Sequence, residues 1–222
     1  MVRILSILAF LLLLVWITLD MKKQVLRDRP LKIWFRTQWD AARTLWGSRR
    51  AMKPGNALGV LRGFFYLLTL ALFFILAITG FVPVVLFGGH LTGVLLLVHA
   101  TAAPLFALSL TLVSLLWAHR QRFSEGNWDT VRVLTDRKPV DPDRSQEVVG
   151  KVCFWLILFF SLPLILSIIL GLFPLFGTEG QETLVLLHGF SALLFTVTAI
   201  IHTYTLTTHS QRRLFYHGEH PK

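Results

Sequence analysis

The stretch LVLLHGFSALLFTVTAIIHTYTLTT, residues 184–208, carries no ionisable side chain except two histidines and one tyrosine over 25 positions. A helix needs roughly 20 apolar residues to cross the hydrocarbon core of a bilayer. Three further apolar runs meet this length, at residues 58–87, 91–118 and 152–176, and a shorter run covers residues 4–19. The chain of 222 residues is 54% hydrophobic and 15% charged. We therefore predict an all-α integral membrane protein with five transmembrane helices.

Basic residues are distributed very unevenly along the chain. Of the 22 Lys and Arg residues, 21 lie in residues 20–62, in residues 119–151 or in the tail after His209. Loops rich in Lys and Arg face the cytoplasm, so we expect the N-terminus outside and the C-terminus inside. The formal charge of +10 then reflects topology and attraction to anionic lipid rather than nucleic-acid binding.

The first apolar run is either a signal peptide or an uncleaved anchor. Arg3 is the only basic residue before it, whereas MKKQVLRDR follows it, and no small-x-small cleavage site stands after Leu19. A signal peptide has the opposite pattern, with positive charge before the apolar region. We therefore interpret residues 1–20 as a transmembrane anchor.

The segment between the first two runs has an amphipathic pattern. Phe35, Trp39, Ala42 and Trp46 recur at steps of four, three and four, which places them on one helical face. A helix of this kind suits the membrane surface, and a soluble linker helix is the alternative. We accordingly divide the chain into the anchor, a cytoplasmic amphipathic linker at 21–57, a four-helix membrane domain at 58–210 and a cytoplasmic tail at 211–222.

His188 and His202 are 14 residues apart in the last apolar run. In a helix this spacing separates the rings by about 40° around the axis and about 21 Å along it. Both histidines would face the same neighbours, one in each half of the membrane. Two stacked b haems in a helix bundle need one axial imidazole each from such a helix. Hydrogen bonding to neighbouring helices, or a proton pathway, are the alternatives.

A haem with two axial histidines needs a second ring at the same depth. His99 lies about as far into its span as His188 does into the last one, so we predict that this pair holds an outer haem. His90 is nine residues before His99, which places it about half a turn round the helix from His99 and at the membrane interface. This position suits a surface or quinone-pocket residue. No histidine matches His202, and Tyr66 is the nearest candidate opposite it. A second, inner haem is therefore an open question.

Residues 58–210 resemble the cytochrome b subunit family of formate dehydrogenases (the gamma subunit), together with nickel–iron hydrogenase cytochrome b and bacterial cytochrome b561. The last span, LLHGFSALLFTVTAIIHTYTLT, is similar to the family's H-x13-H helix with a tyrosine two residues on. The span LRGFFYLLTLALFFILAITGF ends in the family's threonine-glycine pair, here Thr79-Gly80. VHATAAPLFALSL…LLWAHRQRF and SQEVVGKVCFWLILFFSLPLILSIILGL are similar to the next two helices.

The resemblance implies a subunit that passes electrons between an extracytoplasmic redox partner and the quinone pool, rather than a stand-alone catalyst. It carries His188, His202 and His99 over as ligands of haem iron, but Tyr66 or Phe65 stands where the family's first bundle helix has a histidine. It implies haem b as cofactor, one or two per chain. It also implies a place in a hetero-oligomeric complex of the bacterial cytoplasmic membrane, with an iron–sulfur or c-type cytochrome subunit outside.

The resemblance carries the quinone motif only in part. Lys151 is retained, whereas Glu147 and Gly150 stand at the family's asparagine and glutamine positions. We expect quinone near the cytoplasmic end, around Arg62, Lys151 and Tyr204, with His90 as a further candidate. Two other functions compete with this prediction. One is a haem-free anchor or assembly subunit that kept the fold, and the other is a small proton channel or transporter that uses the histidine pair.

Overall fold

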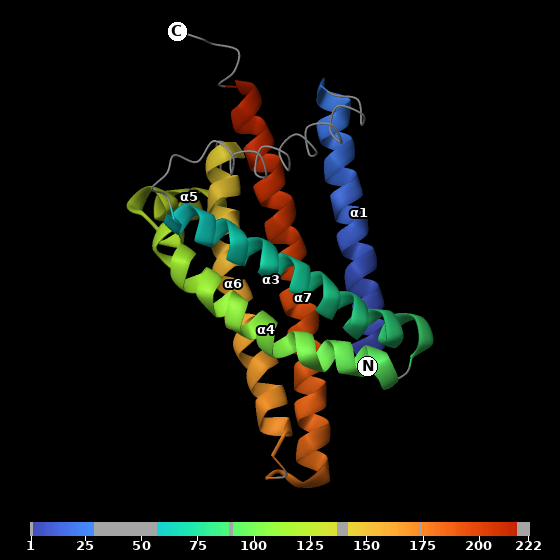
Figure 1. Ribbon diagram of the computed structural model, residues 1–222. Helices are drawn as coiled ribbons and strands as arrows, with labels where there is room; N and C mark the ends of the chain where they lie inside the picture. The colour runs from blue at the N-terminus through green and yellow to red at the C-terminus, as the bar shows by residue number, and fades with distance from the viewer. Residues whose placement is uncertain (1, 29–56, 89–90, 137–141, 174, 217–222) are drawn as a thin grey trace. The chain divides into compact units, whose positions relative to one another are not determined.

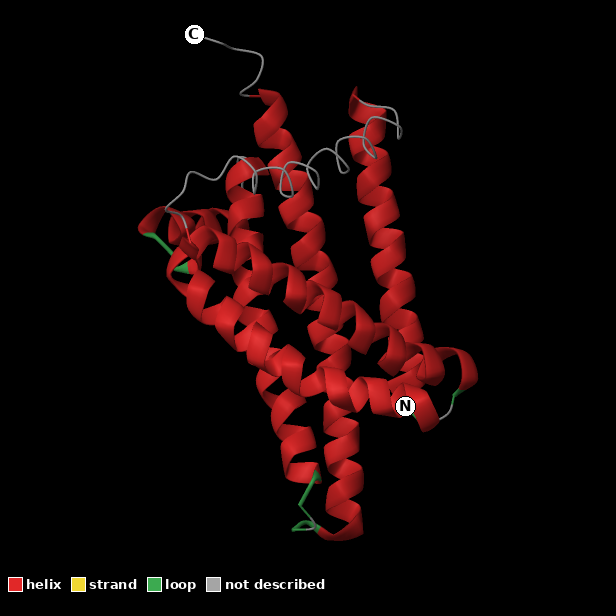
Figure 2. Ribbon diagram, viewed as in Figure 1, coloured by secondary structure: helices red, strands yellow, loops and turns green. Residues whose placement is uncertain are grey.

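The protein is described by a computed structural model, which covers residues 2–28, 57–88, 91–136, 142–173 and 175–216. Helices account for nearly all of these residues, and no strand occurs among them (Figures 1 and 2). The amphipathic helix that we predict at residues 35–46 and His90 both lie outside the described residues.

Six α-helices and two short helical turns follow one another in the described part. They are α1 (Val2–Asp28), α3 (Ala57–Val82), η1 (Pro83–Phe87), α4 (Gly93–Trp117), η2 (Ala118–Gln121), α5 (Glu125–Thr135), α6 (Pro142–Gly171) and α7 (Gly177–Tyr216). Five stretches are long and apolar enough to cross a membrane: Val2–Lys22, Leu58–Phe87, Gly93–Gln121, Arg144–Gly171 and Gly177–Leu206. The prediction of an all-α integral membrane protein with five spans is confirmed.

Large apolar side chains cover the outside of these helices, as a lipid environment requires. Leu12 is 70% exposed and Leu115 is 73% exposed, whereas small hydroxyl residues are buried. Ser109 and Ser167, for example, are almost fully buried and donate to carbonyl oxygens of their own helices. Small residues let helix backbones approach closely inside a membrane, and the hydroxyls of Ser109 and Ser167 are satisfied by their own helices.

Two glycines allow the turns that join the spans. Gly88 follows η1 with φ 66°, and Gly177 begins α7 with φ 63°. Both values lie in the left-handed region, which glycine adopts without steric cost. At Gly88 a side chain would also collide with the Arg3 guanidinium of α1.

The chain divides into two compact units, and α1, α6 and α7 contribute residues to both. Unit 1 comprises Met1–Leu11, Lys53–Arg120 and Leu158–Thr196, and unit 2 comprises Leu12–Met52, Gln121–Ile157 and Val197–Lys222. In unit 1, α3 packs along α4. The buried ring of Phe195 on α7 contacts Phe73 of α3 and Phe106 of α4, with ring centres 6.0 Å and 5.7 Å apart. This aromatic cluster forms the centre of unit 1.

Candidate functional site

His99 on α4 and His188 on α7 face each other within unit 1. Their ring centres are 6.5 Å apart, and the ring planes are inclined at 77°. His99 lies six residues after the start of α4, and His188 lies eleven residues after the start of α7. The structure thus brings together the two rings that the sequence predicts as a pair.

Thr79, near the end of α3, fixes the orientation of the His99 ring. Its Oγ1 lies 2.9 Å from Nδ1 of His99 and donates to the carbonyl oxygen of Ile75 at 2.7 Å. Because the hydroxyl proton is already used, Thr79 accepts from His99, so Nδ1 carries the proton. The lone pair of the neutral ring is then on Nε2.

A backbone carbonyl does the same for His188. Nδ1 of His188 lies 3.1 Å from the carbonyl oxygen of Leu164 on α6, and 3.5 Å from Oγ of Ser167. A carbonyl oxygen can only accept, so Nδ1 is again the protonated nitrogen and Nε2 holds the lone pair. Metal-binding histidines are commonly oriented in this way by a carbonyl or hydroxyl partner on the other ring nitrogen.

The separation of the rings fits one metal ion between them. A metal–imidazole nitrogen bond is about 2 Å, and a ring nitrogen lies about 1 Å from the ring centre, so two axial imidazoles place their centres about 6 Å apart. The observed value of 6.5 Å is close to this. Among the described residues no three His, Cys, Asp or Glu side chains gather at one point. A haem iron already has four nitrogen ligands from the macrocycle and needs only two from the protein.

Gly80 provides room beside His99. A Cβ at this position would lie 3.2 Å from Cε1 of the His99 ring, closer than ordinary contact. Thr79 and Gly80 together therefore position the imidazole, Thr79 by accepting a hydrogen bond from Nδ1–H and Gly80 by leaving space beside the ring. Gly189, next to His188, has a different role: a Cβ there would lie 3.3 Å from Cγ1 of Val2, so it admits α1.

His202 lies in unit 2 and has a different environment. Its Nδ1 is buried and has no hydrogen-bond partner in the described part of the chain, while the backbone of Gly150 on α6 is a polar neighbour of the ring. A buried nitrogen without a partner costs about 1–3 kcal/mol. No second histidine occurs among the described side chains of unit 2. Tyr66, the candidate that we predict opposite His202, belongs to unit 1 and packs against Trp117.

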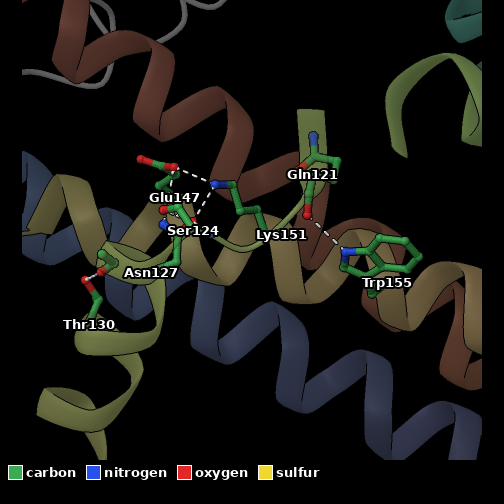
Figure 3. Close-up of polar contacts among 8 residues, drawn as sticks. Gln121, Ser124, Asn127, Thr130, Glu147, Lys151 and Trp155 are labelled. Atoms are coloured by element: carbon green, nitrogen blue, oxygen red, sulfur yellow. Dashed lines mark hydrogen bonds and ion pairs between the residues drawn. The ribbon is translucent and has the colours of Figure 1, made fainter. Parts of the chain in front are cut away.

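Lys151 is the centre of a polar cluster in unit 2 (Figure 3). Its Nζ donates to Oδ1 of Asn127 at 2.7 Å and pairs with Oε1 of Glu147 at 2.8 Å. Asn127 also caps α5, because its Oδ1 accepts from the backbone and side chain of Ser124. Asn127 is not predicted from the sequence, because it lies in a polar segment with no motif to single it out.

The other predicted quinone residues have separate partners. Tyr204 donates from its hydroxyl to Oδ2 of Asp20 on α1 at 2.6 Å, and its ring packs against Trp16 at 5.5 Å. Arg62 belongs to unit 1, where its Nε is buried without a hydrogen-bond partner among the described residues. Lys151 and Tyr204 are thus held by different partners, Asn127 with Glu147 on one side and Asp20 on the other.

The model of a family described as prokaryotic cytochrome b561 matches residues 84–215, which is 132 of the 222 residues. The matched region includes His99, His188 and His202. No curated protein and no solved structure matches the chain.

Proposed function

Because the chain belongs to the prokaryotic cytochrome b561 family, we propose that it is the b-type cytochrome subunit of a respiratory oxidoreductase complex. It would pass electrons between an extracytoplasmic redox partner and the quinone pool. Family membership assigns it to membrane b-type cytochromes of electron transfer. The His99–His188 pair carries the proposal, because its ring separation and its two Nε2 lone pairs suit a single haem iron.

When bound, a b haem supplies one-electron redox chemistry, while the protein sets its axial ligation and surroundings. His99 and His188 are the axial ligands in this proposal. Thr79 and the Leu164 carbonyl hold the two rings in the tautomer that presents Nε2. The apolar side chains of unit 1 keep bulk water away from the ligands, which favours a low local dielectric.

The orientation follows from the charges at the ends of the spans. The basic residues before α3 and after α4 face the cytoplasm, so the N-terminus is outside and the C-terminus inside. His99 is near the start of α4 and Gly80 near the end of α3, so the pair is in the outer half of the membrane. That position suits electron exchange with an iron–sulfur or c-type cytochrome subunit on the outer surface of a bacterial cytoplasmic membrane.

One haem would bind in unit 1, and His202 would be a ligand of a second. Its position 14 residues after His188 on α7 supports this role, because that spacing places the two imidazoles about 40° apart around the helix at two levels. Haem stoichiometry distinguishes the two cases. A value near one per chain leaves the His99–His188 site alone, and a value near two requires a further ligand opposite His202.

Quinone would bind next to the Lys151 cluster. A shallow cavity of about 360 Å³ lies between α5 and α6, lined by Val131, Leu134, Thr135, Val148, Val149 and Val152. The polar heads of Glu147 and Lys151 occur on the same two turns of α6 as three of these valines. An apolar cavity beside a few polar groups is the usual environment of a small apolar ligand with a polar head.

A pyridine haemochrome assay and a reduced-minus-oxidised spectrum of the purified chain test the proposal. We expect a b-type α-band that appears on reduction by a quinol analogue. A chain without b haem after expression with its neighbouring subunits would contradict the proposal and favour the haem-free anchor. If the chain contains haem but no quinol reduces it, the assignment as a b-type cytochrome stands and the proposed reaction with quinone is contradicted.

A further inference from the structure

Two buried N–H donors occur at the end of α3 and α4 remote from the histidine pair. Nε of Arg62 and Nε1 of Trp117 are both inaccessible to solvent and have no hydrogen-bond partner in the described part of the chain. Arg62 lies one turn into α3, and Trp117 is the last residue of α4. A buried donor left unpaired is costly, particularly in a membrane, so an acceptor from elsewhere is expected.

Tyr66 and Arg120 complete this group, which we call the donor cluster: Arg62, Tyr66, Trp117 and Arg120. Tyr66 follows Arg62 by one helical turn on the same face of α3. Its ring centre is 6.3 Å from that of Trp117. The Arg120 guanidinium carbon lies 5.8 Å over the indole ring of Trp117. Two arginines, a tryptophan and a tyrosine are therefore grouped at one end of the α3–α4 pair.

The charge of the donor cluster is not balanced within unit 1. The only acidic residues in the sequence of this unit are Glu179 and Glu182, at the start of α7. Both are in the N-terminal part of α7, as His188 is. His188 contacts His99, which is near the start of α4, whereas Trp117 is the last residue of α4. No ion pair involves Arg62 or Arg120 in the described structure. Two positive charges and two orphan donors together call for an anionic acceptor.

We propose that the donor cluster binds an anionic oxygen group, the phosphate of a membrane phospholipid. Arg62 and Trp117 donate to its oxygens, and Arg120 adds positive charge at the rim. Guanidinium groups recognise phosphate through several directed N–H donors, which makes arginine well suited to this role. The site is independent of the proposed function, because Trp117 is at the opposite end of α4 from His99.

Two conservative variants test the site without removing bulk. Trp117→Phe deletes the indole N–H and keeps an aromatic ring, and Arg62→Gln deletes the charge. Trp155→Phe and Arg132→Gln are matched controls, because Nε1 of Trp155 already donates to the Gln121 carbonyl and Arg132 is an exposed residue paired with Asp129. All four proteins are purified in the same detergent and placed in nanodiscs of phosphatidylcholine with or without phosphatidylglycerol.

The first measurement is the phosphatidylglycerol retained by each protein in native mass spectrometry, and the second is the haem midpoint potential. If phospholipid is the ligand, both test variants retain about tenfold less phosphatidylglycerol than the controls, the effect of losing one hydrogen bond to a charged group. Their midpoint potentials then stay unchanged. An unchanged potential shows that the variants leave the histidine pair, at the other end of α3 and α4, undisturbed.

The inference is overturned if the test variants retain as much phosphatidylglycerol as Trp155→Phe and Arg132→Gln. That result would mean that the donors are satisfied from within the chain. A wild-type protein without haem would contradict the proposed function. The lipid measurement would still decide whether the donor cluster binds phosphate.

Discussion

The Nδ1 atom of His99 lies 2.9 Å from the hydroxyl oxygen of Thr79, one helix away. This contact fixes which nitrogen of the ring is free, because the Thr79 proton is committed to the Ile75 carbonyl. The Leu164 carbonyl imposes the same tautomer on His188. The two rings are thus prepared to bind one metal ion through equivalent atoms.

Replacing Thr79 by valine keeps the shape of the side chain and removes the acceptor. We expect haem affinity to fall by about 10- to 100-fold, the usual effect of losing a hydrogen bond to a metal ligand. The midpoint potential should shift to more positive values, because a less basic imidazole stabilises ferric iron less. Redox titration and haem content measure both effects. Thr101→Val is the control, because Thr101 is exposed on α4 and bonds to the Leu97 carbonyl. Equal behaviour of the two variants would contradict the role of Thr79.

A larger residue at Gly80 should displace the His99 ring. Gly80→Ala adds a Cβ 3.2 Å from Cε1, and Gly80→Val adds further bulk at the same place. Haem occupancy should fall in the order Gly, Ala, Val, while the helix itself gains stability from alanine by up to about 1 kcal/mol. Gly126→Ala on α5 is the control, since its Cβ meets nothing within 4 Å. If haem content is unchanged in Gly80→Val, the space beside His99 has no role.

Asp20 and Tyr204 couple α1 to α7 in unit 2. Their hydrogen bond of 2.6 Å is short, as expected for a hydroxyl that donates to a carboxylate. Tyr204→Phe should lower the free energy of unfolding by about 1.5–3 kcal/mol. Thermal unfolding of the single variants and of Asp20→Asn/Tyr204→Phe gives the coupling energy in a double-mutant cycle. Additive effects would mean that the bond contributes nothing to stability.

Lys151→Gln should affect quinol oxidation without changing the haem. The variant loses the charge that pairs with Glu147 and keeps a donor for Asn127. We expect a several-fold higher KM for a quinol analogue, with the same haem content and spectrum as the wild type. Lys22→Gln is the control, because Lys22 is exposed near the end of the first span. An unchanged KM would contradict the proposal that quinone binds at this end of α6.

The apolar runs were sufficient to predict the spans because length and hydropathy alone decide whether a helix can cross a bilayer. The His99–His188 pairing was also predictable, since residue counts from the span ends give depth. The hydrogen-bond partners of the two rings were not predictable from the sequence. Thr79 is 20 residues from His99, and the Leu164 carbonyl has no side-chain signature, so both depend on how α3, α4 and α6 pack.

The polar residues outside the histidine pair show the same limit. Nothing in the sequence around Asp20 indicates Tyr204, which is 184 residues away. Asn127 belongs to a polar segment in which many side chains could have met Lys151. The orphan donors of Arg62 and Trp117 are visible only once burial is known. The role of His202 as a haem ligand and the position of Tyr66 opposite it stay predictions.

Haem content per chain in the wild type, His99→Ala and His188→Ala tests the central claim most directly. Purified proteins are assayed by pyridine haemochrome, with His119→Ala as the control because His119 is exposed in η2. We predict that each single variant lowers the haem content by one per chain, and that the His99→Ala/His188→Ala double variant loses no more than either alone. Equal haem content in His188→Ala and the control would contradict the account.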